Sequence, residues 1–248
     1  KVCNKWAGSA LMQNEALAVE IAAAVVAACA PHRVPVTLKM RTGWCQQQKN
    51  AVQLARQFEA VGVQMLTVHG RTREQGYKGQ AEYDTIAAVK AAVAVPVVAN
   101  GDITSPEKAR AVLAQTGADA IMIGRAAQGR PWIFREVAHF LATGEQLAPP
   151  LVAEVRRLLL EHLQDHYGLY GQASGVRSAR KHIAWYVRDL PGGEAFRQQI
   201  NTMEDCAAQW QAVADFFDAL GAQMDRLPLA SDDADPTTRE SMHEQPQY

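Results

Sequence analysis

Short apolar runs alternate with amphipathic stretches along the first half of the chain. The runs occupy 34–40, 65–70, 95–102 and 120–124. Their residues are almost continuously apolar, which is typical of strands that are covered on both faces in a parallel sheet. Between the runs, apolar residues recur at helical spacing, as in 51–61, where the pattern stops at a glycine. The pattern predicts a series of β/α units.

Polar side chains follow every one of these runs, at 39–41, 69–71, 100–102 and 124–125. A barrel carries polar groups at the carboxyl ends of all its strands, whereas a doubly wound sheet concentrates them at one switch point. We therefore favour the barrel. Only four strands are visible, so we expect an α/β fold: the C-terminal half of a (β/α)8 TIM barrel followed by an all-α helical domain.

The rest of the chain has a helical pattern, and Pro149-Pro150 marks the expected domain boundary. We expect half of a barrel in 1–148, a helical domain in 149–227 and a disordered acidic tail in 228–248. Beyond the barrel strands, helices are predicted over 132–143, 153–167, 176–190 and 202–220. A capping hydroxyl, an early proline and an acid at 104–107 predict one further helix start, and Gly117 its end.

Composition narrows the class of protein. The chain has 248 residues, 48% of them hydrophobic and 21% charged, which excludes a disordered or fibrous protein. A net charge of −1 does not by itself indicate a polyanionic binding partner. The four cysteines form no CxxC pair and no metal-ligand spacing, so we expect no metal and a reducing, cytoplasmic setting. The apolar run 16–30 contains Glu20 and is short for a bilayer, so we expect no membrane.

The strand ends hold the candidate chemistry. Lys39 interrupts an apolar strand and should meet an anion or an electron-rich ligand edge, unless it only reaches to solvent. His69, Arg71 and Arg73 at a barrel rim suit a phosphate or a nucleotide. We assign no nucleophile to Cys45, and none to Cys3, because neither has a base nearby in sequence.

Two further strand ends suit a phosphate. The segment Asn100–Gly101–Asp102 combines a glycine that permits close approach with two oriented polar groups, although the same residues also make ordinary turns. Gly124 and Arg125 follow the fourth run, where backbone N–H groups and a guanidinium could bind phosphate. Phosphates in barrels commonly dock after the last two strands. This set is moderately specific for a phosphorylated cofactor, and flavin mononucleotide (FMN) is the natural candidate.

The helical part has a basic face. Arg177, Lys181 and Arg188 share one side of a predicted helix, and Arg180 and His182 extend it. Aromatic residues lie beside it. Such a face could bind a nucleic-acid backbone or could be an ordinary solvated surface, and the segment alone leaves both open.

Six motifs together resemble the tRNA-dihydrouridine synthases, the bacterial B-type enzymes above all. The resemblance runs from Lys1 to about Leu220 and rests on Ala7–Met12, Val36–Trp44, His69–Arg73, Ala99–Ile103, Met122–Trp132 and Ala179–His182. It implies a flavin-dependent TIM barrel with a helical tRNA-binding domain. Such enzymes reduce the C5–C6 double bond of a tRNA uridine, with FMN recharged by NADPH. A hydride goes to C6 and a cysteine acid protonates C5.

The resemblance also implies residue roles. Lys39 would contact the flavin ring and His69 would lie on the cofactor, while Asn100, Gly101, Asp102, Gly124 and Arg125 would hold the ribityl phosphate. The implied contacts to substrate uracil or tRNA are Arg71, Arg73, Arg177, Arg180, Lys181 and His182.

The chain departs from the family pattern in one respect. The catalytic cysteine of the family lies in an Asn-x-Gly-Cys-Pro motif that should come just before Lys1, and Cys3 lacks its neighbours. We therefore expect no catalytic residue in this chain. We also expect that these residues alone bind FMN weakly, do not reduce tRNA and are poorly soluble. A monomer is expected.

Three other functions remain open. An FMN barrel of the dihydroorotate dehydrogenase kind would share the lysine and the phosphate loops but would not explain the helical domain. A phosphosugar barrel enzyme without flavin would share the phosphate site alone. The chain could also be a non-catalytic RNA-binding remnant.

Overall fold

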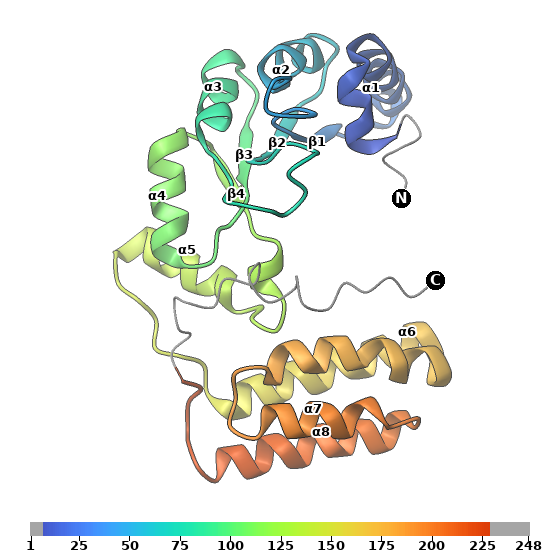
Figure 1. Cartoon of the computed structure of the whole chain (residues 1–248), viewed down its shortest axis with the longest axis vertical. Helices are drawn as coiled ribbons and strands as arrows, with labels where there is room; N and C mark the ends of the chain where they lie inside the picture. Colours follow the sequence, from blue (N-terminus) through green and yellow to red (C-terminus); the bar gives the residue numbers. More distant parts are fainter. Residues whose placement is uncertain (1–6, 229–248) are drawn as a thin grey trace. The chain divides into compact units, whose positions relative to one another are not determined.

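The computed structural model describes residues 7–228, which divide into two compact units, 7–124 and 125–228 (Figure 1). The first unit alternates strands with helices. Its elements in order are η2 (Gly8–Gln13), α1 (Glu15–Cys29), η3 (Ala30–His32), β1 (Thr37–Arg41), α2 (Ala51–Ala60), β2 (Met65–His69), α3 (Asp84–Ala92), β3 (Val97–Asn100), α4 (Pro106–Thr116) and β4 (Ala120–Met122). All four predicted strands are therefore confirmed.

The four strands form one parallel sheet in the order β1-β2-β3-β4. Sequential order is that of a (β/α)8 barrel, because a doubly wound sheet reverses its order at the switch point. The helices follow the same succession, with α1 against α2, α2 against α3 and α3 against α4. The structure thus has the parallel α/β fold of half a TIM barrel, followed by an all-α unit, as predicted.

The two faces of the sheet differ in burial. Leu66, Val68, Val97 and Ala99 are fully buried on one face, in the hydrophobic core of the unit. The alternate residues form the other face, where the outer strands are open: in β1 Lys39 is exposed, and in β4 Met122 is 36% exposed. Successive side chains of a strand point to opposite faces, so the polar residues of β1 share this open face.

Local signals explain the boundaries of α4. The Ser105 side chain accepts a hydrogen bond from the Lys108 N–H, and Pro106 occupies the first helical position. Gly117 ends the helix in the left-handed conformation, with φ 64°. Both ends of this helix lie where the sequence predicts them.

The second unit is helical. Its elements are η4 (Arg125–Ala127), α5 (Ile133–Thr143), α6 (Val152–Val187), α7 (Gly193–Asn201) and α8 (Cys206–Gly221). Helix α6 consists of two segments, because Gly171 has φ 72° and ψ 177° and the chain folds back there. The two segments match the helices predicted over 153–167 and 176–190, and their buried residues form one core with α7 and α8.

Two boundaries differ from the expectation. Helix α7 was not predicted, since it is short and follows the turn-forming Pro191-Gly192. Helix α8 begins four residues later than predicted, because the Asp205 side chain caps it by accepting from the Ala208 N–H. The domain boundary at 148/149 stays a prediction. Of the predicted disordered tail, only Pro228 lies within the described residues.

The segment Glu15–His32, which contains α1, has the length and the mean hydropathy, 1.4, of a membrane-spanning helix. The expectation from 16–30 that this run is too short is therefore not supported by length. Ala18 and Ala22 are buried and α1 packs on α2, so in this structure the segment serves as a helix of the β/α series. One helix of this length and hydropathy is weak evidence for a membrane span.

Candidate functional site

The strand register brings the predicted site residues of the first unit to one edge of the sheet. Arg41 pairs with His69, His69 with Asn100, and Asn100 with Met122, so each is in line at the carboxyl end of its strand. Lys39 lies two residues before Arg41, on the same face. The first unit thus presents a row of cationic and polar side chains at this edge.

His69 is the buried member of the row, with 8% of its surface exposed. Burial, and then the charges of Arg41, Lys39 and Arg71, lower its pKa to about 4, while the charge of Asp102 opposes them. The ring is therefore neutral near pH 7, so one of its nitrogens can donate a hydrogen bond and the other can accept one. Partial desolvation at the sheet face, followed by the charge of Arg41, also lowers the pKa of Lys39.

The neutral ring makes stability depend on pH. The folded-state pKa of His69, about 4, lies below the ordinary 6.5, so the unfolded chain binds the proton more readily. The contribution of the neutral ring to the free energy of unfolding is present above pH 6.5 and is lost as the pH falls toward 4. We expect His69→Gln to reduce the drop in thermal midpoint between pH 7 and pH 5. The same substitution at the exposed His32 is the control, and an equal drop in all three proteins would contradict the prediction.

Arg41 holds the loop after β2. Its guanidinium donates to the carbonyl oxygens of Thr72 and Gly76, both at 2.8 Å. Its Cζ also lies 5.8 Å from the centre of the Tyr77 ring, which is 6.4 Å from the ring of His69. Sequence reasoning left Arg41 and Tyr77 out of the site, because neither residue type signals a loop contact.

A buried ion pair lies behind the row. The Arg71 side chain is 1% exposed and donates to both carboxylate oxygens of Asp102, at 2.8 and 2.7 Å. It also donates to the carbonyl oxygens of Lys78 and Gly79. The same carboxylate accepts the Ala81 N–H at 2.8 Å. These bonds hold both side chains against other groups of the protein. The predicted contact of Arg71 with a substrate therefore has no support from this geometry and stays a prediction.

Backbone shape dominates at the end of β3. Gly101 has φ 126°, and a Cβ there would lie 2.7 Å from the Cβ of Ala81 and 3.2 Å from the His69 ring, so only glycine fits. The Tyr83 hydroxyl donates to the Gly101 carbonyl at 2.9 Å. The Asn100 side chain donates to the Met122 carbonyl. Because the Asp102 carboxylate is bonded to Arg71 and Ala81, a contact of Asp102 with a phosphate would have to come from its backbone.

The remaining loop residues lie further along the chain. Gly124 ends the first unit, and a Cβ there would meet nothing within 4 Å. Arg125 begins the second unit, as the first residue of the short helix η4. The Arg73 guanidinium carbon lies 5.8 Å from the centre of the Trp44 ring. Their roles toward a ligand stay predictions.

The basic face of the second unit is partly neutralised. Arg177 and Arg180 both contact the Glu204 carboxylate, at 3.1 and 2.9 Å. Hydrogen bonds from Arg180 and Arg177 lower the pKa of Glu204. The Lys181 ammonium lies 5.1 Å from the centre of the Trp185 ring and has no carboxylate partner within residues 7–228.

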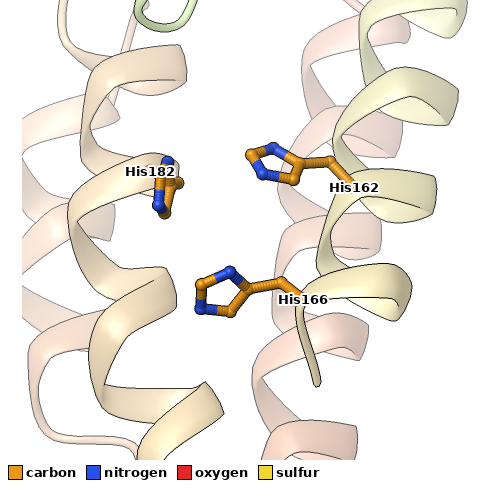
Figure 2. Close-up of side chains that lie close together, drawn as sticks. All are labelled: His162, His166 and His182. Carbon is orange, nitrogen blue, oxygen red and sulfur yellow. The ribbon is translucent and has the colours of Figure 1, made fainter. Parts of the chain in front are cut away.

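His182 does not extend the basic face. It lies in a group with His162 and His166, which sequence reasoning missed (Figure 2). Burial, and then the other two histidines and Lys181, lower the pKa of His182 to about 4, so its ring is neutral near pH 7. The spacing of four residues between His162 and His166 could have signalled that they share a helix face.

Of the cysteines, Cys3 lies outside the described residues, and the Cys45 thiol lies 4.0 Å from the side-chain oxygen of Gln48. This weak contact gives no basis for a nucleophile.

A sequential parallel sheet with polar groups at its carboxyl edge, followed by a helical unit, defines a barrel-type α/β protein. A family model described as dihydrouridine synthase matches residues 1–221. The chain is 58% identical over 217 residues to "tRNA-dihydrouridine synthase B" of Pseudomonas putida, covering 88% of this chain and 64% of that protein. The protein of the same name from Xanthomonas axonopodis pv. citri is 57% identical over 234 residues, covering 94% and 69%.

The chain belongs to the dihydrouridine synthase family. It spans 64% of the length of the Pseudomonas putida relative. Solved structures of mandelate oxidase align with a TM-score of 0.30 and 18% identity, over 81% of this chain and 68% of theirs, and this likeness is too low to carry an argument.

Proposed function

We propose that this chain provides cofactor-binding and RNA-binding parts of a tRNA-dihydrouridine synthase, which reduces the C5–C6 double bond of a tRNA uridine with FMN and NADPH. Family membership supports the reaction, and the aligned row at the sheet edge is the single structural observation that carries it. We also propose a cytoplasmic, monomeric protein. The alternatives are another FMN-dependent barrel oxidoreductase and a non-catalytic RNA-binding remnant.

The residues present fit an anionic, phosphorylated flavin. Lys39, Arg41 and the neutral His69 lie on one face at the strand ends. The carboxylate of Asp102, which would repel a phosphate, is neutralised by Arg71. Gly101 lets the backbone at the end of β3 pack closely against Ala81 and His69, since a Cβ there would clash with Ala81.

FMN, when bound, supplies hydride-transfer chemistry to such a site. The chain's own residues would bind and orient it. Lys39 would place a positive charge beside the flavin ring, where it favours the anionic reduced form. His69 would contact the cofactor as a neutral ring, and the backbone at 100–102 with Gly124 and Arg125 would hold the phosphate. The tRNA base must leave its stack to reach this site.

The proposed function is tested with the natural protein that carries this sequence, purified with its flavin and given NADPH and tRNA lacking dihydrouridine. Mass spectrometry of the digested tRNA should show dihydrouridine that depends on NADPH. Lys39→Met should lower the rate by about 100-fold, while Lys49→Met, which removes only the ion pair with Glu82, should not. Flavin-dependent NADPH oxidation without dihydrouridine would instead support another FMN enzyme.

The RNA-binding part of the proposal has its own test. Reversing charge at Arg177 and Lys181 together to glutamate should weaken tRNA binding by about tenfold or more and make it less dependent on salt, since each phosphate contact contributes to the salt slope. The matched control is Arg157→Glu, an exposed arginine on the first segment of α6 whose partner is Glu161. Equal affinity of both variants, measured by filter binding at two salt concentrations, would exclude an RNA role for this face.

A further inference from the structure

Three histidines meet between the two segments of α6. His162 and His166 are on the first segment and His182 is on the second, and one ring nitrogen of each lies within 4.8 Å of the others. Figure 2 shows His162 and His166 projecting from one helix toward His182 on the other. His166 is buried, and the other two are half-buried. This placement depends on the chain reversal at Gly171.

The ring positions suit a tetrahedral metal ion. A zinc–nitrogen bond of about 2.05 Å sets imidazole ring centres roughly 5.2 Å apart in a tetrahedral site. The ring centre of His182 lies 5.0 Å from that of His162 and 5.3 Å from that of His166. The third separation, between His162 and His166, is 6.2 Å. Two of the three separations are therefore close to that value. Side-chain rotation must supply the third and bring the three ring nitrogens, now within 4.8 Å of one another, to the separation of about 3.3 Å that a tetrahedral zinc site needs.

A hydrogen bond fixes the tautomer of His166. The Ser178 hydroxyl donates to the Ser174 carbonyl at 2.6 Å, so its single hydrogen is used there. Nε2 of His166, 2.7 Å from the Ser178 oxygen, must then be the donor in that contact. The lone pair is left on Nδ1, and Figure 2 shows one nitrogen of this ring turned toward the other two histidines. Metal-bound histidines are oriented by such outer hydrogen bonds.

The protonation states are also suitable. Metal binding requires neutral imidazole. Burial, followed by nearby positive groups, lowers the pKa of both His166 and His182. The positive group that both share outside the trio is Lys181, and its ammonium lies over the Trp185 ring. It would reduce the affinity for a cation without competing for the imidazole lone pairs.

We propose that His162, His166 and His182 bind one Zn²⁺ ion, with the fourth position open to water, and that the ion links the two segments of α6. Imidazole is a preferred ligand of zinc, and a spacing of four residues on one helix face is typical of histidine pairs that bind it. The expectation of no metal rested on cysteine spacing and did not consider these histidines. This proposal does not depend on the enzymatic function.

The test uses the 248-residue chain without a histidine tag, stripped of metal with a chelator that is then removed. Titration with Zn²⁺ against a chromophoric chelator should show one equivalent bound at micromolar or tighter affinity and a raised thermal midpoint. His162→Gln and His182→Gln should each weaken binding at least tenfold. His139→Gln, which removes a histidine of α5 outside the trio, should leave it unchanged.

A second measurement does not depend on the variants. Co²⁺ bound to the wild-type chain should give the visible absorption of a tetrahedral nitrogen site, and Zn²⁺ should displace it. Two results would overturn the proposal. One is the absence of a single tight equivalent with a tetrahedral Co²⁺ spectrum, and the other is Zn²⁺ affinity retained in both His162→Gln and His182→Gln.

Discussion

Replacing Arg71 with methionine is expected to destabilise the first unit by about 3 kcal/mol. Breaking a buried ion pair from one side leaves an uncompensated charge, which costs about 3–5 kcal/mol. The Asp102 side chain is 25% exposed, so water relieves part of that cost and the lower value applies. The Lys78 and Gly79 carbonyls also lose their donor. Urea denaturation followed by circular dichroism measures the change.

The double variant separates the ion pair from the packing of the long side chain. Adding Asp102→Asn to Arg71→Met removes the stranded charge while the amide oxygen can still accept the Ala81 N–H. The double variant should therefore recover about 1 kcal/mol or more relative to Arg71→Met alone. A double variant no more stable than the single one would mean that Arg71 acts by filling space. The same recovery in FMN affinity would support neutralisation of Asp102 as its role in the proposed site.

The strands and helices of the first unit could be predicted because their signals are local. Apolar runs mark β2 and β3, and a serine, a proline and a glycine mark the ends of α4. Strand order could also be argued, since polar groups recur at every strand end. Periodicity and capping, however, do not specify which polar side chains pair with other groups of the protein and which stay available to a ligand.

The pair of Arg71 and Asp102 illustrates that limit. Both residues were assigned to ligands from their position at strand ends, but the loop after β2 folds so that the two side chains satisfy each other. Their contact joins positions 31 apart in sequence, and no local pattern encodes it. The histidine trio was missed for the same reason, because His182 joins His162 and His166 only after the chain reverses at Gly171.

Gly70→Ala is expected to cost about 3 kcal/mol or more in stability, because a Cβ at this position would overlap the carbonyl oxygen of Glu82. The backbones of these two residues are joined by a hydrogen bond of 2.7 Å from the Glu82 N–H to the Gly70 carbonyl, so neither can move independently. A shift of Glu82 would displace Ala81, whose N–H donates to Asp102. The expected result is a lower thermal midpoint and weaker FMN binding together.

Gly124→Ala is the matched control, since a Cβ there would meet nothing within 4 Å and its φ needs no glycine. It should leave the free energy of unfolding within about 0.5 kcal/mol of wild type. Because Gly124 is a proposed phosphate-binding position, this variant can weaken FMN binding without loss of stability. If Gly70→Ala is as stable as Gly124→Ala, the close contact of 70 with 82 does not hold the loop after β2, and the placement of Asp102 by that contact would be refuted.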